Sequence, residues 1–530
     1  MTKPFRTFLK AAVIGMATSV SAHAAQLQGQ LVLQSEATST PLTGVFSVPG
    51  NHARLRIMPA VVSEARIEVN DRVVFDGTLD PAENAQYILT SKDAVKTGEN
   101  ALSVQVKTGE NALSVQVKTG DVAVSVDYPE LEFASPEEGL TATQRKALQQ
   151  TLQPFIGTDP DKHLFPGVAL LVARQGKVLY SAGQGMAQYQ LMNSVRLHSL
   201  ASPRKVTADT VFDLASVTKV VSTTAAVMQL VSEHRLSLDD TLGDLLPGFS
   251  QTDKAGITVQ QLLTHRSGLW EWQPLWLHKR QSRDSVFAWL ASLPRRYGIA
   301  EKRAYSDIGF MLLGRIVEQI SKMPLNDYVY TFVHQPLGMN STRYLPPESW
   351  LDNIAATSQG NPYEQHMVSS STPYPVVENP PFERTFDGYR DYTLTGEAND
   401  GNAWYALEGV AGHAGLFSAL PDLAIYCQTL LNGGGYGNAM LTGPETLAAF
   451  LNTPYDTGQA LGFWRYEDGE GRESFGHAGF TGTQLMFRPD DGLIVIMLTN
   501  RQHNGLRQDG TYPSVKPAWQ AILSVVDSFW

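Results

Sequence analysis

The sequence predicts a mixed α/β domain with a mostly antiparallel sheet, preceded by a small all-β domain of sandwich type. Strand patterns open and close the region 136–530, and a largely helical stretch from about 216 to 335 lies between them. Such segregation of strands and helices is typical of a mixed domain rather than of repeated strand–helix–strand units. Residues 25–130 carry short alternating runs without a helical period, which favours a small β-sandwich.

The N-terminus has the pattern of a secretory signal peptide over residues 1–24. Three basic residues precede an apolar run over 11–20, and Ala22-His23-Ala24 follows as a small-residue cleavage site. The apolar run is shorter than the ~20 residues that a transmembrane helix needs, so we expect cleavage after Ala24 and no stable membrane span. An exported protein of this kind is expected in a bacterial periplasm.

The composition argues against several classes of function. The 530 residues include 41 basic and 52 acidic side chains, a net charge of −11, which argues against nucleic acid as a main partner. The single cysteine, Cys427, forms no internal disulfide and no cysteine-rich zinc site. No metal-binding or phosphate-binding motif stands out, so we expect neither a metal nor a cofactor. The oligomeric state stays unknown at this level.

The accessory domain, 25–130, contains a duplication. The unit 96–106 recurs unchanged at 107–117, and each copy is a turn followed by an alternating strand. Two copies do not make a solenoid, so we interpret them as one added strand or an extruded hairpin. Pieces of this domain resemble sandwich modules that accompany secreted hydrolases. Both a wall-binding role and a purely structural role remain open.

The larger domain, 136–530, is read in chain order. Prolines and acidic residues near Pro129 and Pro136 indicate a linker, and a helical pattern starts at Thr141 and stops before Pro154. Runs at 168–173 and 177–180 predict a hairpin.

The rest of this domain consists of helices, long loops and a strand pair. After the helical stretch, the region from about 340 to 400 is expected to form long loops over a site. Strands at 484–487 and 493–498 and a helix over 518–529 complete the domain.

A serine and a lysine three residues apart are the first candidates for chemistry. Ser-x-x-Lys occurs at 202–205, in a polar stretch read as a loop, and at 216–219, after an apolar approach and at the start of a predicted helix. The spacing puts Ser216 and Lys219 on one helix face. The helix N-terminus offers free N–H groups, and a buried lysine that loses its proton is a base. The Gly-x-Ser-x-Gly elbow is absent, which argues against an α/β-hydrolase.

Two downstream motifs complete a pattern. Tyr305-Ser306-Asp307 precedes an apolar helix, and the box 477–482 (His-Ala-Gly-Phe-Thr-Gly) precedes the terminal strands. With these motifs, residues 160–505 resemble the serine β-lactamase and D,D-peptidase superfamily, in particular class C β-lactamase-like serine hydrolases and penicillin-binding proteins. Further motifs of the resemblance lie at 238–240, 246–249, 262–269, 336–339, 403–405, 409–418 and 431–438.

The resemblance implies a β-lactamase-like fold, in which helices flank an antiparallel sheet and an all-helical subdomain is attached. It also implies an acyl-enzyme on Ser216, with Lys219 taking the serine proton and Tyr305 passing one to the leaving group. The backbone N–H groups of Ser216 and Phe480 would form the oxyanion hole. The box that holds Gly479 and Thr481 would contact the substrate.

The substrate carboxylate needs a cation, and the sequence leaves several candidates. Three Lys-Thr-Gly triplets lie upstream of Ser216, and no lysine occurs between Lys322 and Lys516, so the third-box cation must be histidine or nothing. We choose His477, charged only when protonated, over His413, which we interpret as a loop histidine. Asn500 and Arg501 are further candidates, and a plain surface charge is an equal reading of Arg501.

The second box ends in Asp307 where many relatives carry Asn. A carboxylate accepts from Lys219 but donates no hydrogen bond to a substrate carbonyl. Weak β-lactam hydrolysis follows, and peptide or ester substrates are favoured. We therefore expect a D-alanyl-D-alanine carboxypeptidase that acts on peptidoglycan peptides and takes β-lactams as ligands. An esterase or weak β-lactamase, and a slowly turning over sensor or wall-binding protein, remain as alternatives.

Overall fold

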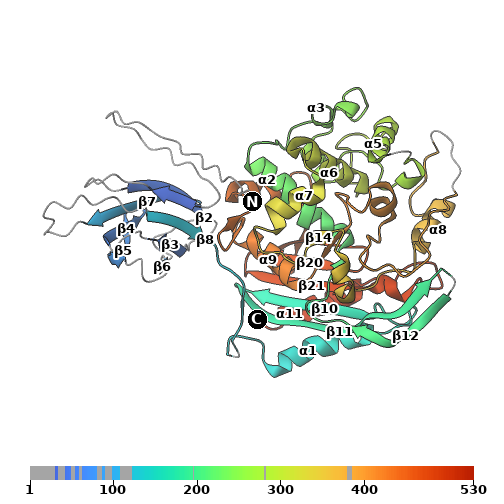
Figure 1. Ribbon diagram of the computed structural model, residues 1–530, viewed down its shortest axis with the longest axis horizontal. Coiled ribbons are helices and arrows are strands. Elements are labelled where there is room, and N and C mark those ends of the chain that lie inside the picture. Colours follow the sequence, from blue (N-terminus) through green and yellow to red (C-terminus); the bar gives the residue numbers. More distant parts are fainter. Residues whose placement is uncertain are drawn as a thin grey trace, which may run out of the picture.

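The computed structural model describes most of the larger domain and parts of the N-terminal region (Figure 1). The expected signal peptide, 1–24, and the second repeat copy beyond Lys107 lie outside the described residues. The described ranges are 30–33, 42–48, 54–58, 63–79, 86–89, 98–107, 122–135, 137–194, 196–279, 282–378 and 385–530.

The N-terminal strands pair into two antiparallel sheets of four strands, in the orders β1-β8-β3-β6 and β2-β7-β4-β5. The first copy of the repeat supplies most of β7. Asn70 and Asp71 connect β4 to β5 with φ of 49° and 63°, the left-handed values that a tight hairpin turn requires. The strands are β1 (Gln30–Leu33), β2 (Leu42–Val48), β3 (Arg54–Met58), β4 (Ser63–Val69), β5 (Arg72–Leu79), β6 (Gln86–Leu89), β7 (Gly98–Lys107) and β8 (Val122–Asp127).

The segment after β8, expected as a linker, is fastened to the larger domain. The amide of Tyr128 donates to the carbonyl of Gly437 at 2.6 Å, and the side chain of Asn432 donates to the carbonyl of Pro129 at 2.7 Å. The amide of Leu131 donates to the hydroxyl of Tyr436 at 3.0 Å. These bonds hold the chain against the hairpin of β16 (Gly435–Tyr436) and β17 (Ala439–Met440).

The larger domain is built on an eight-stranded sheet in the order β12-β11-β10-β21-β20-β19-β18, with β9 pairing β11. Every pair is antiparallel except β9 with β11, so the expected mostly antiparallel sheet is confirmed. The strands are β9 (Glu132–Phe133), β10 (Gly167–Arg174), β11 (Lys177–Asn193), β12 (Arg196–Lys205), β18 (Trp464–Glu467), β19 (Glu473–Ala478), β20 (Gln484–Arg488) and β21 (Leu493–Thr499).

The polar stretch around Ser202, read as a loop, is strand β12. That reading was wrong because β12 is an edge strand whose side chains are mostly exposed on both faces. Without a buried face, such a strand shows no alternation of apolar and polar residues.

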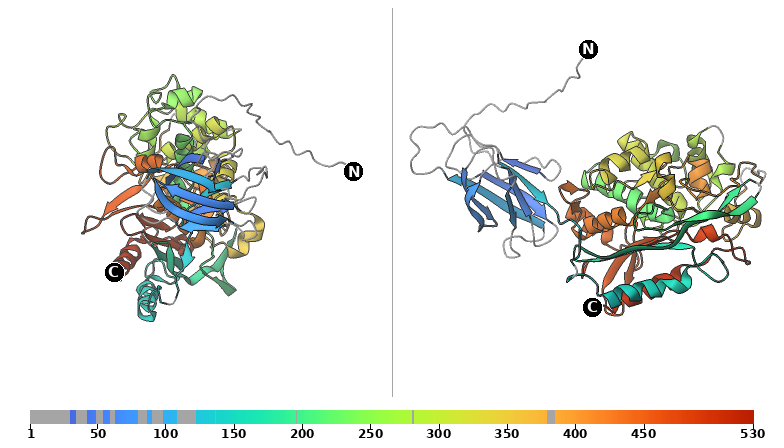
Figure 2. Two further views of the ribbon diagram at one scale, coloured as in Figure 1. Left: turned by 90° about the vertical axis from the view of Figure 1, so that its left-hand side faces the viewer. Right: turned by 60° about the horizontal axis from the view of Figure 1, so that its bottom comes forward.

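Two helices cover one face of the sheet, α1 (Ala142–Leu152) and α11 (Lys516–Asp527), and they lie side by side in Figure 2. Thr141 and Gln144 form a reciprocal capping box that starts α1 where the sequence predicts it. The buried side chains of both helices pack on apolar residues of β10 and β21. The expected terminal strands and last helix are likewise present.

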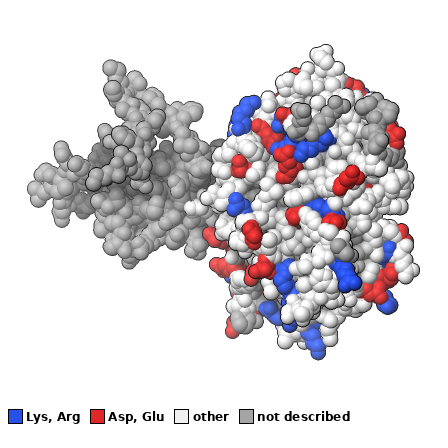
Figure 3. All heavy atoms as spheres, turned by 45° about the vertical axis from the view of Figure 1, so that its right-hand side comes forward, with Lys and Arg blue, Asp and Glu red and all other residues white. Residues whose placement is uncertain are grey.

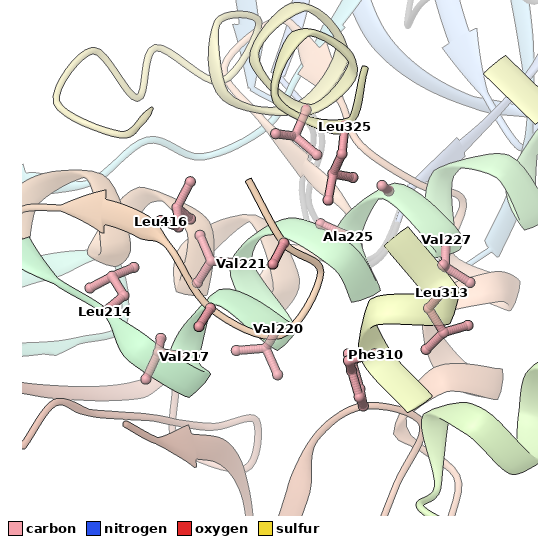
Figure 4. Packing of buried hydrophobic residues seen from close by; sticks show 14 of the residues in the cluster. Leu214, Val217, Val220, Val221, Ala225, Val227, Phe310, Leu313, Leu325 and Leu416 are labelled. Carbon is pink, nitrogen blue, oxygen red and sulfur yellow. The ribbon is translucent and has the colours of Figure 1, made fainter. Parts of the chain in front are cut away.

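The other face of the sheet carries α9 (Leu420–Leu431) and the helical region. Figure 4 shows the core at the start of this region, to which one segment contributes Val217 and Val221 and another contributes Phe310 and Leu313. The helices are α2 (Ala225–Ser232), α3 (Leu242–Leu245), α4 (Val259–Leu263), α5 (Arg283–Ser292), α6 (Asp307–Ser321), α7 (Leu325–Val329), α8 (Pro362–Ser370) and α10 (Pro444–Leu451). A three-stranded sheet, β13 (Phe212–Asp213), β15 (Leu416–Ser418) and β14 (Arg343–Tyr344), lies beside them.

Two surface properties complete the description. Within the described ranges, no helix combines the length and the apolar character that crossing a membrane requires. On the face drawn in Figure 3, acidic and basic side chains are interspersed rather than gathered by sign.

Candidate active site

Ser216 stands on a constrained turn between strand β13 and the helical region. Ala215 adopts φ of 43°, a left-handed value that costs a non-glycine residue about 1–3 kcal/mol. The carboxylate of Asp213 holds this turn, accepting from the amide of Ala215 at 2.8 Å and from the amide of Asn399 at 2.7 Å. Burial raises the pKa of Asp213 to about 6, although both amides oppose it. The expected helix therefore begins as a 3₁₀ turn, Ala215–Val217, then a π-helical segment, Lys219–Thr224.

Lys219 is fully buried and touches three acceptors. Its Nζ donates to Ser216 Oγ at 2.9 Å, to Asp307 Oδ1 at 2.7 Å and to the carbonyl of His413 at 3.1 Å. These partners match the three hydrogens of an ammonium group. Burial lowers the pKa of Lys219, but its interactions with Asp307 and Tyr305 outweigh burial, so the net pKa is raised. The expectation of an unprotonated lysine base is therefore wrong: Asp307 holds Lys219 in its charged form.

Tyr305 lies beside Lys219 on one side and contacts the aromatic rings of His265 and His477. Lys219 Nζ lies 4.9 Å from the centroid of the Tyr305 ring, and this ring contacts His265 at a centroid distance of 4.5 Å. Burial raises the pKa of Tyr305, and the nearby Lys219 opposes this effect without cancelling it. The raised pKa keeps the phenol protonated at rest, with Lys219 and Ser216 among the groups that act on it.

The Tyr-Ser-Asp motif begins helix α6. Ser306 is the N-cap, accepting from the amide of Gly309 at 3.1 Å, while its own amide donates to His265 Nδ1 at 3.0 Å. Asp307 follows in the first helical turn, where its amide donates to the carbonyl of Glu271 at 2.9 Å. The cap and the histidine fix the loop that places Tyr305 and Asp307 on either side of Lys219.

The end of β19 approaches the nucleophile turn from the opposite side. Among the described residues, neither the amide of Ser216 nor that of Phe480 has a hydrogen-bond acceptor, and both residues line the same cavity. Two free amides beside a nucleophile have the form of an oxyanion hole. Phe480 itself is 41% exposed, so its ring lies at the cavity mouth.

Gly479 and Thr481, expected to contact substrate, instead join β19 to the nucleophile turn. The hydroxyl of Thr481 donates to the carbonyl of Asp213 at 2.7 Å, and that of Thr483 donates to the carbonyl of Leu214 at 2.9 Å. A Cβ on Gly479 would collide with Thr483 and with the carbonyl of Leu214, so this position requires glycine. Both residues are positioning residues.

His477 lies behind Tyr305 and outside the cavity lining. Its ring stacks on Trp464 at 4.5 Å, and Nδ1 contacts the carbonyl of Ala478 at 2.7 Å. Burial and the neighbouring ammonium of Lys219 lower the pKa of His477 to about 3. The expected protonated histidine that attracts a carboxylate is therefore wrong, because the imidazole is neutral at physiological pH.

The side chains of Asn500 and Arg501 form hydrogen bonds with backbone groups. Asn500 accepts from the amide of Gly167 at 3.1 Å and donates to the carbonyl of Ala187 at 3.0 Å. Arg501 donates to the carbonyl of Phe480 at 2.6 Å and to that of Pro513 at 2.8 Å. Arg501 thus supports the Phe480 loop, and neither residue lines the cavity.

Three residues of the site escaped the sequence analysis in whole or in part. The carbonyl of His413 binds Lys219, and its Nε2 lies 2.9 Å from Asp400 Oδ1, so this histidine belongs to the site although it was read as a loop residue. Glu364 lies on the same wall, on α8. Burial, together with the charge of Asp400, raises the pKa of Glu364 to about 8. Gly-His-Ala-Gly occurs at 412–415 and again at 476–479, and this repetition was a usable signal for His413. The loop-rich region 340–400 carries no periodic pattern that singles out Asp400 or Glu364.

These groups surround one cavity of about 200 Å³. Its wall comes from the nucleophile turn, the start of α6, helix α8, the loops on either side of it and the end of β19. The lining residues are Ala215, Ser216, Trp272, Tyr305, Asp307, Ser358, Asn361, Tyr363, Glu364, Met367, Pro373, Tyr374, Asn399, Asp400, Ala414, Phe480, Gln502 and Tyr512.

One group of side chains has the composition of a metal site. Asp307, Asp400 and His413 bring one potential ligand atom each to within 4.8 Å of one another. However, Lys219 already neutralises Asp307, and His413 already binds Asp400. A metal ion would have to displace both contacts, so these residues do not fit a metal centre.

Comparisons with known proteins agree with this arrangement. A model of the β-lactamase family matches residues 148–515. A protein of Salmonella enteritidis PT4 is 30% identical over 417 residues, covering 74% of this chain and 90% of the relative. A protein of Salmonella gallinarum gives the same values. Both carry the provisional name D-alanyl-D-alanine carboxypeptidase.

Solved structures share the fold at lower identity. A penicillin-binding protein homologue from Caulobacter crescentus superposes with a TM-score of 0.51 at 22% identity, covering 74% of this chain and 98% of its own. The D-amino acid amidase from Ochrobactrum anthropi gives 0.51 at 18% identity, covering 73% and 99%. The match to the family model spans more than half of the sequence, and the chain therefore belongs to the β-lactamase family of serine hydrolases.

Proposed function

We propose that this serine hydrolase is a periplasmic D-alanyl-D-alanine carboxypeptidase that acts on peptidoglycan peptides through an acyl-enzyme on Ser216. The observation that carries the proposal is the 2.9 Å contact from Lys219 Nζ to Ser216 Oγ, inside a cavity that also holds Tyr305 and two free amides. The names of the relatives support the substrate class. The pattern of residues 1–24 supports export.

The geometry supports a proton shuttle through Tyr305. Ser216 Oγ forms a bond to the substrate carbonyl carbon and gives its proton to the Tyr305 hydroxyl, which passes its own proton to the leaving amine as the C–N bond breaks. The Lys219 ammonium stabilises the negative charge on the two oxygens during this transfer. The amides of Ser216 and Phe480 bind the carbonyl oxygen. In deacylation, the water oxygen bonds to the acyl carbon and gives a proton to Tyr305, and Tyr305 returns one to Ser216 Oγ as the ester bond breaks.

A hydrolase of neutral amides or esters is the second candidate, and the cavity wall favours it. No lysine, arginine or histidine occurs among the described residues that line the cavity. A free C-terminal carboxylate would therefore meet no cation on the wall, whereas an amide or ester end needs none.

The two candidates separate in one experiment. We expect the protein to release D-alanine from an acyl-D-alanyl-D-alanine peptide, and a labelled penicillin to form one covalent adduct, located on Ser216 by mass spectrometry. Preference for the free acid over its C-terminal amide supports the carboxypeptidase, and the reverse preference supports the amidase or esterase.

Ser216→Ala is the matched variant because it removes one oxygen and leaves the turn intact. It should lose both the adduct and turnover, by at least about a thousandfold for a missing nucleophile. Retention of either activity in this variant would contradict the assignment of Ser216. An adduct without turnover would point to a binding protein instead of a hydrolase.

A further inference from the structure

Asp400 presents a carboxylate to the active-site cavity. One of its oxygens, Oδ1, accepts from the amide of Ala403 at 2.7 Å and lies 2.9 Å from His413 Nε2. Burial raises the pKa of Asp400, but His413, the amide bound to Oδ1 and Lys219 outweigh burial, so the net pKa is lowered. The side chain is therefore ionised at neutral pH, and the two contacts of Oδ1 hold it in one orientation.

The second oxygen of this carboxylate, Oδ2, is accessible from the cavity. No described residue donates a hydrogen bond to it, since both contacts of the side chain involve Oδ1. Asp400 keeps 21% of its side-chain surface exposed, and Oδ2 does not belong to the buried polar atoms that lack a partner. In the neighbouring carboxyl of Glu364, by contrast, both oxygens accept hydrogen bonds, from Gly401 and from Asn361. Asp400 Oδ2 thus offers the cavity a charged acceptor.

Asp400 lies close to the atoms that react. Asp400, Asp307 and His413 each bring a side-chain atom to within 4.8 Å of the other two. Asp307 Oδ1 and the carbonyl of His413 both accept from Lys219 Nζ. Lys219 in turn donates to Ser216 Oγ at 2.9 Å. Ser216 and Asp400 line one cavity of about 200 Å³, which is only a few water molecules wide. A water molecule bound to Oδ2 therefore lies near the acyl group that Ser216 carries.

We propose that Asp400 Oδ2 binds the water that hydrolyses the acyl-enzyme and orients it toward the acyl carbon on Ser216. One hydrogen of this water passes to Tyr305 as the water oxygen bonds to the acyl carbon, and Oδ2 holds the other hydrogen. Tyr305 returns a proton to Ser216 Oγ as the ester bond breaks, and the hydrogen held by Oδ2 stays on the product acid. This inference rests on the proposed function and adds to it a residue that acts in deacylation.

Methanol distinguishes the orientation of water from general support of the site. Methanol has a single O–H, whose hydrogen passes to Tyr305, so a methyl group instead of a hydrogen faces Asp400. Asp400 therefore favours water over methanol as the acceptor of the acyl group. The test uses the p-nitrophenyl ester of N-acetyl-D-alanine in dilute methanol and measures the ratio of methyl ester to free acid by chromatography. Ser216→Ala supplies the uncatalysed background, which is subtracted.

Asp400→Asn and Asp400→Ser both remove the charged acceptor and keep one oxygen for the amide of Ala403. Each should raise the ratio of methyl ester to acid at least about tenfold, the effect of losing one hydrogen bond to a charged group. Labelled penicillin should still form its adduct on Ser216 within about threefold of the original rate, which also shows that the variant is folded. An unchanged product ratio overturns the inference, and slower adduct formation with an unchanged ratio indicates a purely structural role.

Glu397→Gln is the matched control. Glu397 is three residues from Asp400 and pairs with Arg390 at 3.1 Å, but it is not among the described residues that line the cavity. This variant should keep the product ratio of the unmodified protein, and an equal rise in Glu397→Gln and Asp400→Asn overturns the inference. If the unmodified chain forms no penicillin adduct on Ser216, the proposed function fails. An adduct together with unchanged product ratios removes only the role of Asp400.

Discussion

Lys219 keeps an ammonium group in a fully buried position because three acceptors surround it. A buried lysine ordinarily loses its charge, and here Asp307 reverses this tendency. The carboxylate of Asp307 therefore affects which side chain can accept the serine proton. In the proposed mechanism, Lys219 acts as a fixed positive charge and Tyr305 transfers the proton. Asp307, a single acidic residue in the second motif, therefore accounts for the charged state of Lys219 in the proposed mechanism.

The buried imidazole of His477 makes a prediction about pH. With its pKa at about 3, this ring stays neutral from about pH 5 to 9, so it contributes no step to the activity profile in that range. We expect the profiles of kcat/KM for the unmodified protein and for His477→Gln to have the same shape. A limb near pH 6.5 that disappears in His477→Gln would contradict this expectation.

The lowered pKa of His477 also makes the free energy of unfolding depend on pH. The folded-state pKa of His477 lies below its unfolded value of 6.5, so its contribution is present above pH 6.5 and is lost as the pH falls toward 3. Free energies of unfolding measured by urea titration should therefore fall less steeply with acid in His477→Gln than in the unmodified protein.

At the scale of elements, strand β19 and the nucleophile turn form one unit. The hydroxyls of Thr481 and Thr483 bind two successive carbonyls of the turn, Asp213 and Leu214. Phe480, whose amide is free, directly precedes Thr481 in the sequence. Its distance from Ser216 therefore depends on these hydrogen bonds, so the oxyanion hole is set by contacts between two elements far apart in the chain.

Thr481→Val tests this coupling because it keeps the shape of the side chain and removes the hydroxyl. We expect a loss of about 1–3 kcal/mol in the free energy of unfolding, because the carbonyl of Asp213 is left without its donor. Acylation of Ser216 by labelled penicillin should slow by roughly tenfold, since the oxyanion amides are no longer held in place.

Thr429→Val is the matched control. Its hydroxyl donates to the carbonyl of Ile425 inside α9, away from the cavity, and it is equally buried. This variant should lose stability and keep the acylation rate. If both variants slow acylation alike, the slowing reflects general destabilisation, and Thr481 has no special positioning role.

At the scale of the whole molecule, the sheet separates a structural layer from a catalytic layer. Helices α1 and α11 cover one face, and the helical region with the cavity lies on the other. Both layers pack on the same strands, β10 and β21. Among the described residues, no side chain of α1 or α11 lines the cavity.

Ile522→Ala tests the separation of the layers. Ile522 is fully buried on α11, and removing its side chain should cost about 2–5 kcal/mol of unfolding free energy, measured by urea titration. KM should stay the same, because the change lies across the sheet from the cavity. Gln520→Ala on the exposed side of α11 should change stability by less than about 0.5 kcal/mol. A large change of KM in Ile522→Ala would contradict the separation.

The sequence predicted those secondary-structure elements that are marked by a pattern of a few neighbouring residues. The capping box at Thr141 and Gln144, the hairpin over 168–180 and the apolar strand β21 were all visible in the sequence. The edge strand β12 was not, because its exposed faces carry no alternation. The pair Ser216 and Lys219 was predicted by its spacing, but the contact that fixes the charge of Lys219 spans 88 residues.

By itself, the sequence determined the family, the mostly antiparallel sheet and the pairing of the proposed nucleophile Ser216 with Lys219, because these depend on short motifs and on periodicity. Only the tertiary structure decided the charges of the site. A pKa depends on burial and on neighbours that are distant along the chain, as the lowered pKa of His477 and the raised pKa values of Lys219 and Glu364 demonstrate. For the same reason, the structure moved His413 into the site and Arg501 out of it.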